Sequence, residues 1–311
     1  MHCRFFALLG AAIALASVFV LSGGSASAAR SATPPRPAFP VTLTASNGKV
    51  TIVRRPRRIV SLSATATEDL FAIGAGRQVI AVDDQSNYPA KAPHTKLSGY
   101  KPNAEAVAGY KPDLVVASSG ANGLLAALHK FKIPVLLDPP APTLAQAYAQ
   151  ITQLGRATGH TTGARRLVRR MRTQIATLVK ATPRGRSLSV YHELSPDYYS
   201  ATSKTFIGRV YSLFGLRNIA DSADKTGSGY PQLAGEYVIA SNPDLIVLSD
   251  TKCCAQTPQT VAARPGWSGL KAVRNGTVVP VNDDIASRWG PRIVTFARRI
   301  AAAVKRAEAE G

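Results

Sequence analysis

The hydrophobic pattern alternates between short apolar runs of the strand type and longer amphipathic segments. The short runs, rich in β-branched residues, are Val41 to Thr44, Val50 to Val53, Arg58 to Leu62 and Val79 to Val82. Asn47-Gly48 favours a tight hairpin turn between the first two, because both residues tolerate positive φ. A helix capped by Thr65 or Thr67 is expected to run through Ile73. Strands alternating with helices predict a parallel α/β architecture.

An internal repeat indicates that this α/β unit occurs twice. Glu105 to Ser118 reads EAVAGYKPDLVVAS, Glu236 to Ser249 reads EYVIASNPDLIVLS, and seven of the 14 positions are identical. Each copy predicts a helix with a Glu near its positive N-terminus, a stop at Pro-Asp and then a buried strand. A further strand is expected after each copy, at Ile133 to Leu137 and at Val278 to Val281. The sequence therefore predicts two similar α/β lobes.

The segment between the two copies has helical periodicity. Apolar residues recur at helical spacing from Leu144 to Val179, with basic residues on the other face, and Gly159 and Gly163 either break this helix or weaken it. We expect one long helix that holds the lobes rigidly apart. The predicted divisions are a signal peptide at 1–28, a Pro-rich linker at 29–40, an N-terminal lobe at 41–141, an interlobe helix at 142–182 and a C-terminal lobe at 183–311.

The first residues have the pattern of an export signal. A short basic start precedes an apolar run from Phe5 to Leu21, and Ala26-Ser27-Ala28 forms an A-x-A cleavage site. Leu21-Ser22-Gly23-Gly24 resembles a lipobox in which Gly replaces the obligatory Cys. We therefore expect an exported, unlipidated protein, periplasmic or associated with the cell envelope, whose mature chain begins near Ala29.

The charge is strongly positive, with 38 Lys plus Arg against 18 Asp plus Glu and a net charge of +20. Basic residues without acids gather from Ala29 to Arg58 and from Pro139 to His192, and more basic residues lie from Arg288 to Arg306. A nucleic-acid footprint would add interleaved stacking aromatics or a reading motif, and the sequence contains neither. A secreted binder of nucleic acid or another anionic polymer stays an alternative, but we expect no nucleic-acid partner.

Several motifs, in the same order along the chain, resemble one known family. They are Arg58-Ile59-Val60-Ser61-Leu62-Ser63 with Ala66-Thr67-Glu68, then Asn87-Tyr88-Pro89, Pro112-Asp113-Leu114-Val115, and Asp283-Asp284 leading to Arg288-Trp289-Gly290-Pro291-Arg292. The resemblance is to the periplasmic binding proteins for cobalamin and iron chelates, the solute receptors of ABC importers. It covers Val41 to Val304 and implies a class III fold, two α/β lobes joined by one long helix, with ligand held in the cleft between them.

The resemblance also implies ligand-binding residues. The family's cleft aromatics fall on Tyr88, Tyr100, Tyr199 and Tyr230, and its polar ligand contacts fall on Asp284 and Arg288. Flat aromatic faces with a polar tip suit a macrocycle such as a corrin or porphyrin. The implied ligand is a corrinoid such as cobalamin, or a ferric siderophore, and Ser118 stands where the cobalamin receptors have a further cleft Trp. Haem is an alternative, because haem receptors of this family place an iron-ligating Tyr at the position of Tyr100.

The same resemblance implies a membrane partner. Glu105 and Glu236 match the two lobe-tip acids that dock on arginines of the permease, and one Glu per lobe suits the equivalent halves of a homodimeric permease. We expect a monomer that meets the membrane surface only through this permease dimer. The expected protein is no enzyme and has no cofactor apart from the transported ligand.

Other chemistry finds little support in the sequence. The His residues are scattered, so no metal site is expected, and His192-Glu193 does not extend to H-E-x-x-H. Cys253 and Cys254 are adjacent and either form a vicinal disulfide or stay as thiols. The hydroxyls of Ser61, Ser63 and Thr67 follow the first long strand and are expected to line the cleft. An extracytoplasmic hydrolase would need a nucleophile with a base, and the sequence shows no such pair.

Overall fold

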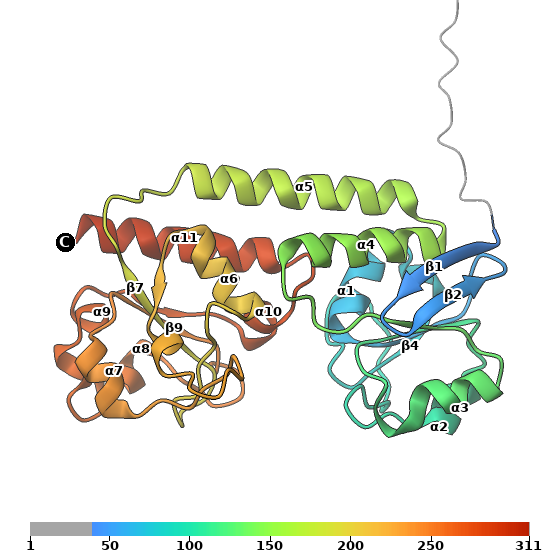
Figure 1. Cartoon of the computed structure of the whole chain (residues 1–311), viewed down its shortest axis with the longest axis horizontal. Coiled ribbons are helices and arrows are strands. Elements are labelled where there is room, and N and C mark those ends of the chain that lie inside the picture. Colours follow the sequence, from blue (N-terminus) through green and yellow to red (C-terminus); the bar gives the residue numbers. More distant parts are fainter. Residues whose placement is uncertain (1–38, 311) are drawn as a thin grey trace, which may run out of the picture. The chain divides into compact units, whose positions relative to one another are not determined.

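Two four-stranded parallel sheets form the framework of the protein, and the computed structural model describes residues 39–310 (Figure 1). The N-terminal sheet has the order β4-β3-β5-β6 and the C-terminal sheet the order β8-β7-β9-β10. When the strands of each sheet are numbered 1 to 4 in chain order, both sheets have the spatial strand order 2-1-3-4. The repeat supplies the helix before the third strand and that strand itself in each case, so the predicted duplication is confirmed.

The strands and helices of the first lobe alternate along the chain. They are β1 (Val41–Ala45), β2 (Gly48–Ile52), β3 (Ile59–Leu62), α1 (Ala64–Ala72), η1 (Gly76–Gln78), β4 (Val79–Val82), α2 (Ala104–Gly109), β5 (Leu114–Ala117), η2 (Ala121–Gly123), α3 (Leu124–Lys130) and β6 (Val135–Leu137).

The second lobe follows the helix pair α4 (Leu144–Thr158) and α5 (Thr161–Lys180). Its elements are β7 (Ser189–Glu193), α6 (Phe206–Leu213), β8 (Arg217–Asn218), η3 (Ile219–Ser222), α7 (Gly235–Ser241), β9 (Leu245–Leu248), α8 (Pro258–Ala262), η4 (Trp267–Gly269), α9 (Lys271–Arg274), β10 (Val278–Pro280), α10 (Asp283–Ser287) and α11 (Ile293–Ala309).

Two helices occupy residues 142–182, so the single interlobe helix is wrong, and the break that the sequence left open occurs at Gly159. Gly159 ends α4 in the left-handed conformation at φ 77°, which favours glycine, and α5 then packs back against α4. Gly163 lies inside α5. Because α4 also contacts α1 and β1 it belongs to the first lobe, whereas α5 contacts α11 of the second lobe and provides the connection (Figure 1).

Two local predictions need smaller corrections. The hairpin turn centres on Ser46 and Asn47, and only Gly48 takes a positive φ. Asn47 instead bonds the edge strand β6 through its side chain, to the carbonyl of Val135 and the amide of Leu137. Ser63, rather than either threonine, caps α1 by accepting from Ala66 N.

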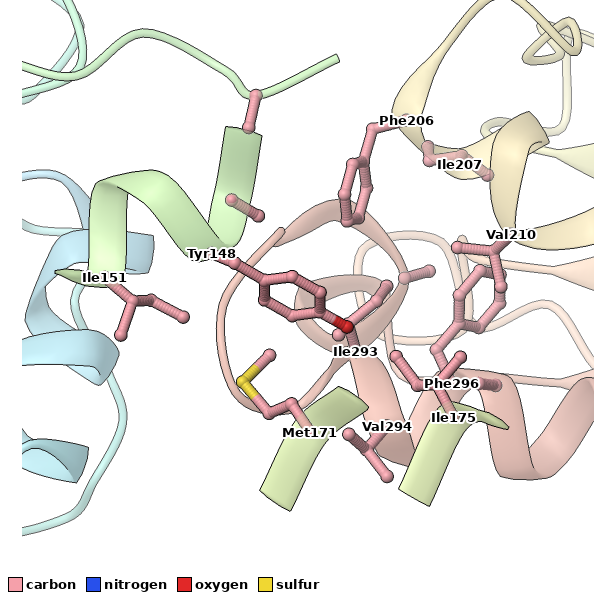
Figure 2. Close-up of a cluster of buried hydrophobic side chains, with 14 of the residues drawn as sticks. Tyr148, Ile151, Met171, Ile175, Phe206, Ile207, Val210, Ile293, Val294 and Phe296 are labelled. Carbon is pink, nitrogen blue, oxygen red and sulfur yellow. The ribbon is translucent and has the colours of Figure 1, made fainter. Parts of the chain in front are cut away.

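One hydrophobic core continues from lobe to lobe. Figure 2 shows Tyr148 and Ile151 of α4 with Met171 and Ile175 of α5, packed together with side chains of α6 and α11 such as Phe206 and Phe296. Each lobe has a further core on the other face of its sheet. The shared core fixes the connecting helices to both lobes by hydrophobic burial. None of the helices within residues 39–310 combines the length and apolarity needed to cross a bilayer.

Candidate functional site

The four predicted tyrosines all lie beyond the carboxyl ends of strands. Tyr88 and Tyr100 follow β4 in the first lobe, while Tyr199 follows β7 and Tyr230 follows β8 and η3 in the second. Their side chains are exposed by 47%, 81%, 44% and 50%, respectively. This is the edge of a parallel sheet where α/β proteins bind ligands, so the tyrosines occupy the expected location in both lobes.

Tyr100 projects from a tightly packed backbone. A Cβ on the preceding Gly99 would lie 2.6 Å from Oδ2 of Asp83 and 3.2 Å from the carbonyl oxygen of Leu62, so only glycine fits there. Asp83 is itself buried, and this burial raises the pKa of its carboxyl. The close approach fixes the start of the loop that presents Tyr100 to solvent.

The ring of Tyr88 makes a cation–π contact at the boundary between the lobes. The guanidinium of Arg292, which precedes α11, is 4.4 Å from the centroid of the Tyr88 ring. This contact orients the ring, since Arg292 is in turn held by Glu68.

Tyr199 and Tyr230 belong to one two-stranded ribbon. Tyr199 is bridged antiparallel to Gln232, and Ser200 N donates to the carbonyl of Pro231 at 2.9 Å. This register places Tyr199 and Tyr230 diagonally on the same face. The second lobe therefore presents two adjacent exposed phenol rings.

Asp284 and Arg288, predicted to contact ligand, link the two lobes. Arg288 is 7% exposed, and it donates to Glu68 Oε1, Asn87 Oδ1, the carbonyl of Gln85 and Asp284 Oδ1 at 2.8 to 2.9 Å. Burial raises the pKa of Asp284, but the hydrogen bond from Asn87 and the charge of Arg288 outweigh it and hold the pKa below its usual range. Ligand contact by this pair stays a prediction, since the protein itself engages both groups.

Glu68 is the acceptor at the centre of this interlobe network, and we did not single it out from the sequence. It is 2% exposed and lies in α1, where it accepts from Arg288 at 2.9 Å and from Arg292 at 2.6 and 2.9 Å. In the sequence, Glu68 ends the motif Ala66-Thr67-Glu68, and Arg292 ends the motif that begins at Arg288. The order of motifs along the chain does not show that side chains 220 residues apart contact one another in the fold.

A second buried ion pair supports the tyrosine ribbon. Glu193, at the end of β7, accepts hydrogen bonds from both terminal nitrogens of Arg264 at 2.6 Å. The Arg264 guanidinium also lies 4.7 Å from the centroid of the Trp267 ring and 5.5 Å from that of Tyr198. Tyr198 also stacks on Trp267. Because Tyr198 precedes Tyr199, this stack anchors the backbone of the ribbon.

Burial raises the pKa of the nearby Asp250 carboxyl to about 7, with the charge of Glu193 acting in the same direction. Within residues 39–310, neither carboxyl oxygen of Asp250 has a hydrogen-bond partner. Burial therefore favours the protonated form of the Asp250 carboxyl.

The three predicted hydroxyl side chains and His192 are buried. Ser61, Ser63 and Thr67 are at most 5% exposed and bond one another or the backbone, so the expectation that they line a cleft is wrong. His192 is 3.0 Å from Ser249 Oγ, but both are buried, and burial lowers the His192 pKa to about 3.

Neither the cysteines nor the other metal-binding side chains add a further site to the described residues. Cys253 and Cys254 are both free thiols. In the part of the chain that the structure describes, no three His, Cys, Asp or Glu side chains are grouped to hold a metal ion.

Glu105 and Glu236 occupy equivalent positions in the two lobes. Each lies in the first turn of the helix before the third strand, α2 and α7, and each is exposed. Neither forms a salt bridge within residues 39–310. Figure 1 shows α2 and α7 on the side of their lobes away from α5.

Comparison with known proteins places these features in a family. Residues 59–284 match the profile of the periplasmic binding proteins. Two curated relatives are each 32% identical to this chain: an uncharacterized ABC transporter substrate-binding lipoprotein of Bacillus subtilis, over 86% of both chains, and a cobalamin-binding protein of Halobacterium salinarum, over 85% of this chain and 73% of its own.

Solved structures show the same fold. The periplasmic vitamin B12 binding protein of Vibrio cholerae superposes with a TM-score of 0.69 at 24% identity, covering 81% of this chain and 98% of its own. The periplasmic heme-binding protein of Roseiflexus sp. RS-1 gives the same TM-score at 23% identity and the same coverage. With the duplicated sheets and the profile match over most of the described residues, this chain belongs to the periplasmic binding protein family.

Proposed function

We propose that this chain is the exported substrate-binding protein of an ABC importer and that it captures a corrinoid or a ferric chelate between its lobes. One observation carries the proposal: of the six large hydrophobic side chains that are exposed within residues 39–310, four are the tyrosines at the carboxyl edges of the two sheets. Single exposed hydrophobic side chains are ordinary, whereas several gathered at one part of a surface mark a binding site. Two rings on each lobe suit a large flat ligand held between them.

Cobalamin is the preferred ligand, and haem is the alternative. The relatives named for cobalamin or vitamin B12 binding favour a corrinoid. Haem is favoured by Tyr100, whose phenol is the most exposed of the four and is free to ligate iron. Arg288 is already engaged by protein acceptors, which disfavours a strongly anionic siderophore that would depend on this residue.

The test is titration of the purified mature protein with cyanocobalamin, haemin and a ferric hydroxamate siderophore. We expect one-to-one binding of cyanocobalamin, tightest of the three, with quenching of Trp289, a half-buried residue beside the Arg288 network. A Soret shift with haemin that Tyr100→Ala abolishes would select the haem alternative. Binding of none of the three would contradict the proposed function.

We further infer that the protein delivers its ligand by docking on a permease dimer through Glu105 and Glu236. Their exposure, their equivalent positions and their lack of a basic partner within residues 39–310 support this role. In this account the protein is a monomer that acts by binding rather than catalysis, needs no cofactor and meets the membrane only through the permease.

We also propose that the protein is exported. The predicted signal peptide at 1–28 and linker at 29–40 lie almost wholly outside the described residues, so export rests on the sequence pattern. The relative of Bacillus subtilis is named a lipoprotein, whereas Gly replaces the lipobox Cys here, and we propose an unlipidated protein of the periplasm or cell envelope.

A further inference from the structure

Five arginines surround a cavity at the opposite edge of the N-terminal sheet from the tyrosines. The cavity has a volume of about 930 Å³, and its arginines are Arg54, Arg55, Arg57, Arg58 and Arg77. Four of them lie between β2 and the start of β3, and the fifth lies in η1 just before β4. Since the tyrosines follow the carboxyl ends of the strands, this cavity is separate from the proposed ligand site.

The charges lining this arginine cavity are unbalanced. Asp113 is the single acidic residue among its lining, and its carboxylate already accepts the backbone amides of Arg57 and Arg58 at 2.9 to 3.1 Å. None of the five guanidinium groups forms a salt bridge with a carboxylate in residues 39–310. Like charges this close repel one another, and an anion in the cavity would relieve that repulsion.

Two of the guanidinium groups are held in place by the protein. Arg55 donates from Nε to the carbonyl of Thr158 at 3.1 Å, and its Nη2 is 2.8 Å from Nε2 of His160. Arg58 donates to the carbonyls of Lys111 and Tyr110 at 3.0 and 2.7 Å. These contacts orient the planar guanidinium groups, but their acceptors are uncharged and so leave the positive charges unbalanced. The cavity is therefore preorganised to bind an anion.

The other three arginines are exposed and keep their donors free. The side chains of Arg54, Arg57 and Arg77 make no hydrogen bond within the described residues, and each guanidinium carries five N–H groups in a fixed fork. Phosphate groups match this fork, because each offers several charged oxygens for paired hydrogen bonds.

We propose that the arginine cavity binds a phosphate oxyanion carrying at least two negative charges. Its volume accommodates more than one phosphate group, and its five cations exceed what a single carboxylate would balance. The phosphate is either part of a soluble anion such as pyrophosphate or the headgroup of an anionic phospholipid. The proposal does not depend on the proposed transport function, because the two sites lie at opposite edges of the sheet.

Calorimetric titration with pyrophosphate in 150 mM NaCl tests the proposal. The wild type is expected to bind, and the triple variant Arg54→Gln, Arg57→Gln, Arg77→Gln is expected to lose about tenfold or more in affinity. The matched control removes the same charge from exposed arginines of α5, through Arg165→Gln, Arg169→Gln and Arg170→Gln, and is expected to bind like the wild type. Circular dichroism verifies that both variants fold.

Vesicle sedimentation forms the second arm and identifies the source of the phosphate. Binding to phosphatidylglycerol vesicles but not phosphatidylcholine vesicles, lost in the cavity variant and kept in the α5 control, supports the proposal with a lipid headgroup. Pyrophosphate binding with the same variant pattern and no vesicle binding supports a soluble anion. Failure of the wild type to bind in both arms, or equal losses in both variants, would overturn the proposal.

Discussion

Replacing Glu68 by Gln is expected to lower the free energy of unfolding by about 3 to 5 kcal/mol, since a buried ion pair that loses one partner leaves uncompensated charge. Glu68 accepts from both Arg288 and Arg292, and their side chains are only 8% and 17% exposed. A glutamine keeps one acceptor but turns an amide donor toward two guanidinium groups. The loss would therefore fall on the contact between the lobes. Urea denaturation followed by circular dichroism measures it.

The matched control is Glu105→Gln, which changes an exposed glutamate of α2 that forms no salt bridge within residues 39–310. We expect a change within about 0.5 kcal/mol for this variant, as for most surface substitutions. Equal stability of Glu68→Gln and the wild type would show that the Glu68 network does not hold the lobes together.

Reversing the charge of both acids proposed to dock on the permease, Glu105→Lys with Glu236→Lys, is expected to lower ligand uptake by about tenfold or more. Placing a like charge against the arginines of a partner costs several kcal/mol, and each 1.4 kcal/mol is tenfold in affinity. Each single variant should retain partial uptake if docking uses both lobes, because the unchanged acid of the other lobe is still present. Uptake is measured in cells that lack the chromosomal gene and carry each variant.

Ligand affinity separates docking from capture in the same experiment. The double variant should bind ligand like the wild type, since Glu105 and Glu236 lie in α2 and α7 rather than among the four tyrosines. Glu310→Lys, at the exposed end of α11, is the matched charge control and should leave uptake unchanged. Normal uptake by the double variant would exclude docking through these two acids.

The duplicated architecture could be predicted from the sequence because the repeat spans a whole structural unit. A helix start, a Pro-Asp stop and a buried strand follow one another within 14 residues, so local rules suffice. The shared 2-1-3-4 strand order comes from the structure, because right-handed connections between parallel strands restrict the possible orders without selecting one.

The helix pair and the interlobe network could not be predicted in the same way. Apolar spacing continues from α4 into α5 because both helices bury a face in the same core, and the periodicity does not reveal the left-handed Gly159. Arg288 was singled out as a ligand contact, which stays a prediction, and three of its four partners lie about 200 residues away. A sequence cannot show which charges are already paired. The exposed tyrosines came from family resemblance, and the structure adds their position at the two sheet edges.

Capture of ligand between the lobes is tested most directly by calorimetric titration of two single-tyrosine variants. Tyr100→Ala alters the first lobe and Tyr199→Ala the second, and Phe131→Ala removes an aromatic that is 50% exposed at the end of α3. With whichever of cyanocobalamin, haemin or ferric hydroxamate the wild type binds most tightly, we predict that each tyrosine variant loses about tenfold or more in affinity. The Phe131 variant should bind normally. A wild type that binds none of these ligands, or an affinity that depends on only one lobe, would contradict capture between the lobes.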